Sequence, residues 1–317
     1  MRPGVAAARE DLCDPAYQDC RSPLWTLIKN ETTEIDVGLW YMTDPSISNL
    51  IVQRFQAGVR VRILMDPREF GNPDGSQSTA DKQVIDQLSA AGIPLRKRVA
   101  SGIEHWKVMV FAGQNTVYFG SSNFSGYELA PIRPWVNYSD DIAYFTDDMT
   151  IVQSFMTEFD KACVDTTGYA TYANPPTSLV RSYPVYAIDP SLDFVPDQDY
   201  ATRAVHQYDA ETQRIDFDMF RITDLRHTNA ITAAAARAVG VRLIWHSHSG
   251  HRPSGAEPRQ AGPALRAGRS DLRILELELA VRRHPARGEL THYVSIAVVT
   301  SHNDAAAATA TVDQVSQ

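Results

Sequence analysis

The chain has 317 residues, of which 44% are hydrophobic and 21% are charged, and its formal net charge at pH 7 is −8. This length exceeds what one small core needs and predicts one large domain or two lobes. No apolar run is long enough for a membrane-spanning helix, so no integral membrane segment is expected. The acidic balance argues against broad, sequence-independent binding of nucleic acid, although it is compatible with a single cationic pocket.

The amino-terminal segment, residues 1–20, is expected to be an extension ahead of the first lobe. It lacks the apolar stretch of a secretory signal, so a soluble, cytoplasmic chain is the default expectation, and export would require a signal peptide on a longer precursor. Three cysteines, Cys13, Cys20 and Cys163, are too few for a disulfide framework. Cys13 and Cys20 could form one disulfide in an exported protein, or both could be free thiols.

Residues 35–66 and 215–246 form an internal repeat that aligns without a gap, with nine identities in 32 positions. Ile35 aligns with Ile215 at one end and Arg62 with Arg242 near the other. Each copy predicts a strand, a helix and a second strand. In the first copy, Asp44 is placed to cap the helix and Pro45 suits its first position. A strand–helix–strand crossover favours parallel pairing, so the predicted fold class is α/β, with a duplicated α-β-α sandwich.

The segments around the repeat define the other predicted elements and the domain boundaries. Hydrophobic periodicity predicts a helix near 80–91, a short strand at 94–98, a hairpin of strands at 108–111 and 117–119, and an amphipathic helix at 149–163. We therefore assign residues 21–170 to a first lobe, 171–213 to a proline-rich connector, and 214–246 to the start of a second lobe.

The stretch IEHWKVMVFAGQNTVYFGSSNFSG, residues 103–126, carries the candidate catalytic groups. His105 and Lys107 are two residues apart, so on an extended strand both project from the same side and can meet one ligand. Gly120 permits a tight turn that presents polar side chains beside this strand. This segment, here called the GSSN turn, holds the candidate phosphate-binding residues Gly120, Ser121, Ser122 and Asn123.

The pair His105 and Lys107, followed by the GSSN turn, resembles the HxK…GSxN signature of the phospholipase D superfamily. The resemblance covers residues 20–246, and the repeat is similar to that family's two-lobed fold. It implies a phosphodiesterase in which one histidine attacks phosphorus and forms a phosphohistidine, while the other lobe's histidine protonates the leaving oxygen. It also implies that Lys107 balances the phosphate charge and that the serine and asparagine side chains bind the phosphate oxygens or fix the histidine.

The same resemblance implies that neither a metal nor a cofactor is needed. One position departs from the family pattern: the aspartate expected five residues after the lysine is replaced by Ala112. We interpret this change as the loss of an orienting group, because a buried carboxylate normally orients its neighbours and does not attack phosphorus.

The second half of the catalytic site does not appear at the expected place. In the register of the repeat, the partner histidine and lysine should stand where the chain has Pro285 and Arg287. In the second GSxN segment only Ser301 and Asn303 match. His284 and Arg287 could be a shifted, degenerate pair, and a homodimer could instead supply the second histidine.

Composition changes beyond the repeat, and residues 247–317 are expected to be atypical and poorly structured. From 247 to 292 the chain contains eight Arg but no Lys, Phe, Trp or Tyr, so the large aromatic contributors to a core are missing. A shifted reading frame in GC-rich coding sequence would produce this tail, and the other two frames beyond codon 246 should then encode an H-x-K and a GS-x-N. The nearby tract of His246, His248 and His251 lacks acidic or cysteine partners, which favours a surface loop over a metal site.

Three functions remain open from the sequence. The first is a phospholipase D-like hydrolase or transferase that acts on a phosphodiester, with a phospholipid headgroup favoured. The second is a nuclease of the same superfamily, which the acidic charge makes less favourable. The third is a catalytically impaired relative that keeps a phosphate-binding pocket without turnover.

Overall fold

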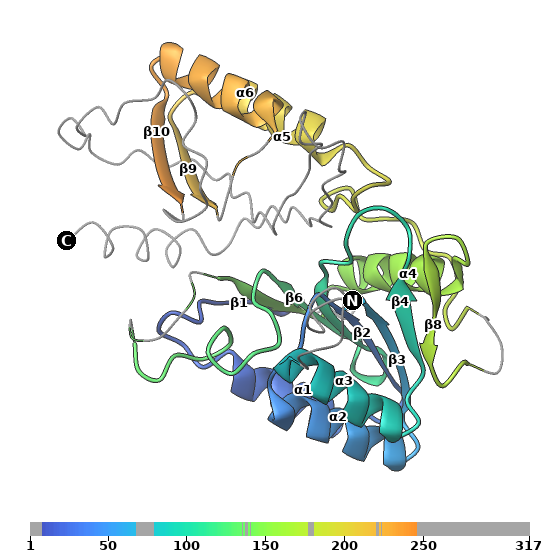
Figure 1. The fold of residues 1–317 in the computed structure, drawn as a ribbon. Helices are drawn as coiled ribbons and strands as arrows, with labels where there is room; N and C mark the ends of the chain where they lie inside the picture. Colours follow the sequence, from blue (N-terminus) through green and yellow to red (C-terminus); the bar gives the residue numbers. More distant parts are fainter. Residues whose placement is uncertain are drawn as a thin grey trace, which may run out of the picture. The chain divides into compact units, whose positions relative to one another are not determined.

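The computed structural model describes residues 8–67, 79–134, 136, 139, 141–176, 181–219, 222 and 224–245. The described residues divide between Pro190 and Ser191 into two compact units, here called the first and the second unit (Figure 1). The predicted second motif and the tail at 247–317 lie outside the described residues. The reading-frame hypothesis therefore stays a prediction. The division of the chain into an extension, a first lobe, a connector, the start of a second lobe and a tail also stays a prediction.

The first unit is built around an eight-stranded sheet of mixed direction. Its strands β2, β3 and β4 are parallel neighbours, and the remaining pairs are antiparallel. The spatial order of the strands is β1-β7-β6-β5-β2-β3-β4-β8. The strands span Glu10–Cys13 (β1), Glu34–Leu39 (β2), Arg60–Met65 (β3), Leu95–Arg98 (β4), Lys107–Phe111 (β5), Thr116–Gly120 (β6), Ala143–Thr146 (β7) and Tyr169–Ala173 (β8).

Helices cover both faces of this sheet, which confirms the predicted α/β class (Figure 1). The first face carries α1 (Arg21–Asn30), α2 (Pro45–Gln56) and α3 (Ala80–Ala90), and the second face carries α4 (Met149–Val164). Alternation along the strands supplies both layers of the core. On β5, for example, Met109 and Phe111 belong to the core under α1, α2 and α3. On the α4 side, Phe119 of β6 stacks on Phe155.

The second unit repeats the beginning of the first. It contains α5 (Tyr200–Ala210), β9 (Arg214–Met219), α6 (Leu225–Ala236) and β10 (Gly240–Trp245), and β9 pairs with β10 in parallel as β2 pairs with β3. The strands and α6 follow their counterparts in the register that the sequence repeat predicts. The duplication is therefore confirmed, and it extends back to include α1 and α5, which the sequence analysis did not predict.

Local capping is repeated in the two units as well. Asp44 and Asp224 each accept a 2.8 Å hydrogen bond from the backbone N–H two residues later, at the start of α2 and α6. Glu31 and Glu211, which follow α1 and α5, each accept hydrogen bonds from the next three backbone N–H groups. The aspartate caps and the glutamate carboxylates both bind backbone N–H groups at helix starts and strand starts. They therefore hold the backbone in the same conformation in both units.

The second residue after α2 and after α6 has a left-handed backbone, but only one of the two is glycine. Gly58 has a φ of +91°, and its counterpart Ala238 has a φ of +66°. A side chain makes this conformation less favourable by about 1 kcal/mol. We therefore expect Ala238→Gly to raise the free energy of unfolding of the second unit by roughly 0.5–1 kcal/mol, measured by urea denaturation followed by circular dichroism.

A matched control comes from the same helix. Ala233→Gly, at an exposed position inside α6, should lower the free energy of unfolding by about 1 kcal/mol, because glycine is a poor helix former. Gly58→Ala should also destabilise, and only through the backbone, since a Cβ there would meet nothing within 4 Å. An Ala238→Gly chain that is less stable than wild type would contradict the left-handed conformation.

A buried ionic network joins β2, β3 and α4 in the first unit. Arg62 forms a two-pronged pair with Asp36, at 2.7 and 2.8 Å, and donates a third bond of 2.7 Å to Asp160. Tyr183 donates its hydroxyl to Asp36 at 2.6 Å and its backbone N–H to Asp160 at 2.9 Å. Asp36 and Asp160 are fully buried, so their charges depend on Arg62 and its neighbours for compensation.

The repeat preserves the arginine–aspartate pair in the second unit, but in a more exposed form. Arg242 of β10 contacts Asp216 of β9 at 2.7 and 2.9 Å, with the geometry of Arg62 and Asp36. The side chains of Arg242 and Asp216 are 37% and 30% exposed, against 6% and 0% for the first pair. The same two-residue motif thus has two environments in one chain.

Cys13 and Cys20 form a disulfide that joins the end of β1 to the residue before α1, which settles one of the alternatives left open by the sequence. Cys163 is a buried free thiol in α4. In the parts of the chain that the structure describes, no helix is both long enough and apolar enough to span a bilayer.

Candidate active site

The candidate residues gather where the parallel strands of the first unit end. β2 ends at Leu39 and β3 at Met65, while β5 runs antiparallel to β2 and begins at Lys107. Leu39 and Lys107 are register partners, so the residues after β2 and those before β5 meet at one edge of the sheet. The carboxyl edge of parallel strands is the usual ligand-binding edge of open α/β sheets.

His105 and Lys107 contact each other at this edge. The Lys107 Nζ atom lies 2.6 Å from His105 Nδ1, 3.2 Å from Nε2 and 2.9 Å from the backbone oxygen of His105. An ammonium group can only donate, and these contacts place the Lys107 cation directly beside the imidazole ring. β5 begins only at Lys107, and His105 therefore lies in the loop before the strand, beside the ring of Trp40 at 5.0 Å.

The GSSN turn lies next to this pair. The register of β5 and β6 pairs Val108 with Phe119, so one further step places Lys107 opposite Gly120. The sequence analysis expected Gly120 to form part of a turn, but it is the last residue of β6. A Cβ on Gly120 would lie 2.1 Å from the backbone oxygen of Ile142, so glycine is required by the close approach of two strands.

The polar groups of the GSSN turn differ in what they already bind. Ser121 Oγ accepts a 2.9 Å hydrogen bond from the backbone of Ile142. Asn123 donates its backbone N–H and its side-chain NH₂ to one oxygen of Glu128, at 2.8 and 2.7 Å. Ser122 Oγ and Asn123 Oδ1 are buried and have no hydrogen-bond partner among the described residues. Buried polar atoms of this kind are unfavourable without a partner, which is consistent with a ligand-binding role.

Several residues at this edge were missed by the sequence analysis. Trp40 and Tyr41 follow β2, Glu104 precedes His105, and Glu128 lies five residues after Asn123. Only Glu128 and Glu104 had a usable signal, since each is a carboxylate within a few residues of a predicted site residue. Trp40 and Tyr41 come to the edge through the pairing of β2 with β5, which local sequence does not reveal.

The position of the missing family aspartate, Ala112, also has a structural context. The next residue, Gly113, donates its backbone N–H to Glu31 Oε1 at 3.0 Å, and Gln114 donates its side-chain amide to Glu31 Oε2 at 3.2 Å. A carboxylate from the end of α1 is therefore present at this turn although Ala112 has none.

Glu104 is a buried acid directly before His105. It is 4% exposed and accepts hydrogen bonds from the Tyr169 hydroxyl and from the backbone of Trp106, while its own N–H donates to Asp66 at 2.9 Å. Burial raises the pKa of the Glu104 carboxyl to about 7, although the bond from Tyr169 and the charge of Arg98 act in the opposite direction. Glu104 thus links the loop that carries His105 to β8 and to the end of β3.

This raised pKa predicts a pH-dependent stability. Between the ordinary value near 4.5 and about 7, the folded chain keeps a proton on Glu104 that the unfolded chain releases. Rising pH therefore favours unfolding across this range, by about 3 kcal/mol in total. We expect Glu104→Gln to be more stable than wild type at pH 8 by up to that amount and to match it near pH 5, in urea denaturation at both pH values.

The variant must be compared with wild type at both pH values, because Glu34 also lowers the stability of the fold as the pH rises. Burial and the nearby Asp36 raise the pKa of Glu34 as well, so the whole chain loses stability towards alkaline pH. An equal loss of stability between pH 5 and pH 8 in wild type and in Glu104→Gln would contradict the prediction.

The other described histidines, His206 and His227, belong to the second unit. His227 is buried in α6, where its ring contacts the Tyr208 hydroxyl at 3.1 Å and burial lowers its pKa. His206 lies on the exposed face of α5. His284, Arg287, Ser301 and Asn303 lie outside the described residues. Within the described ranges no cluster of three or more His, Cys, Asp or Glu side chains is suited to a metal ion.

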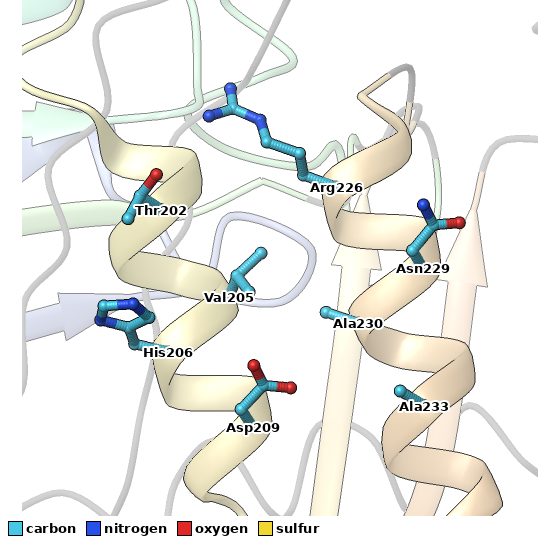
Figure 2. A pocket seen from close by; sticks show the side chains of 8 residues that line it. All are labelled: Thr202, Val205, His206, Asp209, Arg226, Asn229, Ala230 and Ala233. Carbon is cyan, nitrogen blue, oxygen red and sulfur yellow. The ribbon is translucent and has the colours of Figure 1, made fainter.

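A shallow, open pocket of about 370 Å³ lies in the second unit, between α5 and α6 (Figure 2). Its walls combine apolar and polar helix side chains, namely Thr202, Val205, His206, Asp209, Arg226, Asn229, Ala230 and Ala233. None of the residues predicted as catalytic or phosphate-binding lines it.

Comparison with known proteins places this fold in context. Residues 24–163 match the family described as the PLD-like domain of cardiolipin synthase. A mitochondrial cardiolipin hydrolase of Xenopus tropicalis is 26% identical over 147 residues, which cover 46% of this chain and 62% of that protein. A protein of the same name from Chlamydomonas reinhardtii is 26% identical over 130 residues, covering 41% of this chain and 51% of that protein. The chain thus spans little more than half the length of these relatives.

Among solved structures, a phosphatidylserine synthase from Haemophilus influenzae superposes with a TM-score of 0.57 at 13% sequence identity. The alignment covers 74% of this chain and 61% of that protein. At this identity the likeness concerns the fold alone, and it extends well beyond residues 24–163.

Proposed function

Since residues 24–163 belong to the phospholipase D superfamily, we propose that this chain hydrolyses a phosphodiester through a phosphohistidine on His105. The contact between Lys107 and the His105 ring, at 2.6 Å, is the observation that carries the proposal. It pairs a nucleophile with a cation at the carboxyl edge of the sheet, beside a turn whose Ser122 Oγ and Asn123 Oδ1 have no partner among the described residues.

The reaction needs two steps. A lone pair of the His105 imidazole attacks phosphorus, the bond from phosphorus to the leaving oxygen breaks, and that oxygen takes a proton from an acid. Water then attacks the phosphohistidine, gives a proton to the same acid group in its basic form, and releases a phosphomonoester and free His105. Lys107, which is 3% exposed, balances the phosphate charge in a poorly hydrated place where its ammonium group acts strongly.

The acid is proposed to be a second histidine from another copy of the chain. His105 is the only described histidine of the first unit, and His206 and His227 belong to α5 and α6 of the second unit. A homodimer that brings two copies of His105 together would complete the site. The residues at the counterpart position in the repeat, Pro285 and Arg287, cannot act as this acid.

The proposed substrate is a phospholipid. The matched family and both relatives are named for enzymes of cardiolipin, which is a phospholipid diester, and the net charge of −8 disfavours a polyanionic nucleic acid. The test incubates the purified chain with phosphatidylcholine vesicles with and without cardiolipin, and separately with single- and double-stranded DNA. We expect a phosphomonoester lipid to appear and the DNA to stay intact. Cleavage of DNA alone would support the nuclease, and cleavage of neither would support an impaired relative.

A further inference from the structure

A loop leaves the candidate active site after β6 and returns to it before β7 (Figure 1). We call residues 126–141 the β6–β7 loop, of which the structure describes 126–134, 136, 139 and 141. The two ends of this loop are joined beside the GSSN turn, because the Ser121 N–H donates to the Ile142 oxygen and the Ile142 N–H donates to Ser121 Oγ, both at 2.9 Å. The loop therefore begins and ends at the edge of the sheet that carries the candidate site.

The first part of the β6–β7 loop is buried and held by three other segments. Glu128 is 4% exposed and accepts hydrogen bonds from Asn123 of the GSSN turn and from the Tyr41 hydroxyl after β2. The oxygen of Leu129, whose side chain is fully buried, accepts the Cys20 N–H at 2.9 Å. Cys20 is itself joined to β1 by the disulfide. The base of the loop is therefore packed into the fold.

The residues that follow place apolar side chains in solvent. Ile132 is 77% exposed and Val136 is 38% exposed, and Arg133 and Pro134 between them are exposed as well. The Val136 N–H donates to the Arg133 oxygen at 3.0 Å, so the chain turns tightly here. Single exposed apolar residues are ordinary, but neighbouring ones on a loop with a fixed base form a patch suited to an apolar partner. We call Ile132, Arg133, Pro134 and Val136 the loop tip.

The charge of the loop tip differs from that of the whole chain. The net charge is −8, yet between the buried Glu128 and Asp140 the sequence contains Arg133 and no acidic residue. Exposed apolar side chains beside a cation are typical of surfaces that bind bilayers. The apolar groups enter the headgroup region, and the arginine pairs with lipid phosphates. The tip therefore complements an anionic lipid surface, although the chain as a whole is acidic.

We propose that the loop tip docks the first unit on a phospholipid surface and thereby brings the candidate site to its substrate. This inference rests on the proposed function, because the diester of a phospholipid lies at the bilayer surface and an enzyme must bind that surface to reach it. Since both ends of the loop are joined beside the GSSN turn, docking by the tip brings lipid headgroups to the edge that carries His105 and Lys107.

Vesicle binding tests the tip directly. His105→Ala chains, which should leave the lipid intact, are mixed with vesicles of phosphatidylcholine and cardiolipin, and binding is measured by flotation. In this background Ile132→Asp should weaken binding by about tenfold or more, because it replaces an apolar side chain by a charge that anionic lipid repels. Arg133→Gln should weaken binding to these vesicles about fivefold and leave binding to phosphatidylcholine alone unchanged.

Val185→Asp is the matched control, because it introduces the same charge at another exposed apolar position of the first unit. Val185 is 70% exposed, but it belongs to a segment that packs along α4, where the Tyr183 N–H donates to Asp160 at 2.9 Å. We expect the control to bind vesicles within about twofold of its parent chain, since an isolated exposed valine needs no partner.

A turnover experiment uses the same substitutions in the chain that keeps His105. We expect Ile132→Asp to lower the hydrolysis of vesicle phospholipid by about tenfold and to leave the hydrolysis of a soluble chromogenic phosphodiester within about twofold of wild type. The reason is that Ile132 is exposed and belongs to neither the catalytic pair nor the GSSN turn. Val185→Asp should behave as wild type with both substrates.

Two results would overturn the docking claim: vesicle binding that Ile132→Asp leaves unchanged, or equal losses in Ile132→Asp and Val185→Asp. Unchanged vesicle binding together with the loss of a wild-type dimer on sedimentation would assign the tip to a contact between two copies of the chain. Vesicle binding that depends on Ile132, in a chain that hydrolyses no diester, would count against the proposed function alone.

Discussion

His105→Ala is expected to lower the rate of phosphodiester hydrolysis by a factor of about 10⁴ or more, because water is the only nucleophile left in place of the imidazole. His105 is only partly buried and precedes β5, so the strand ladder from Lys107 to Phe111 should remain intact. The measurement is the initial rate with a chromogenic phosphodiester, together with thermal unfolding followed by circular dichroism. His206→Ala, on the exposed face of α5, is the control and should behave as wild type.

The same variant tests whether two copies share one site. If a dimer holds a single site made of two His105 side chains, mixing wild type with an excess of His105→Ala converts most wild-type chains into inactive heterodimers. The rate per wild-type chain should then fall as the excess increases. A constant rate per wild-type chain would contradict the shared site, and equal rates for wild type and His105→Ala alone would remove His105 from the mechanism.

The second large effect concerns stability. Arg62→Met is expected to lower the free energy of unfolding of the first unit by about 3–5 kcal/mol, because it leaves Asp36 and Asp160 buried without their cation. Arg62 also lies over the rings of Phe159 and Tyr183, so some of the loss is packing. Urea denaturation followed by tryptophan fluorescence measures this effect.

The repeat provides the matched control for this prediction. Arg242→Met removes the same side chain from the same strand position, but its partner Asp216 is 30% exposed and can be solvated by water. We expect a loss of about 0–1 kcal/mol in the second unit, followed by circular dichroism. Equal effects at the two positions would contradict the claim that burial, and not the ion pair itself, makes Arg62 important.

Much of the fold could be predicted because the sequence carries it locally. The apolar runs at 108–111 and 117–119, the helical stripe of 149–163 and the cap at Asp44 all depend on near neighbours in the chain, and all three predictions are confirmed. The repeat supplied the parallel pairing of β2 with β3 and of β9 with β10, since a duplicated strand–helix–strand unit leaves few alternatives.

The elements that were missed are those that depend on distant partners. The short strand β1 forms by pairing with β7, and its first residue, Glu10, lies opposite Thr146, far along the chain. β8 pairs with β4 at the opposite edge in the same way. α5 lies in the segment predicted as a proline-rich connector, and its apolar positions are filled mainly by alanine and tyrosine, which weakens the hydrophobic period.

The candidate site also contains some features that neighbouring residues determine and others that depend on distant parts of the chain. His105, Lys107 and the GSSN turn could be proposed from their spacing, and the contact of His105 with Lys107 follows from two neighbouring residues. Tyr41 and Glu128 could not be linked in the same way, because they lie far apart in the chain and only the folded sheet brings them together. The contact of Tyr41 with Glu128 therefore emerged from tertiary structure alone.

The most direct test of the central claim is to trap the covalent intermediate on His105. The chain is mixed with a phosphodiester at mildly acidic pH, where the group that activates water is protonated and release is slowed, and is then quenched, digested and analysed by mass spectrometry. The account predicts a phosphoryl adduct on the peptide that contains His105, and none in His105→Ala. Turnover with the adduct on another residue, or with no adduct on any peptide, would contradict it.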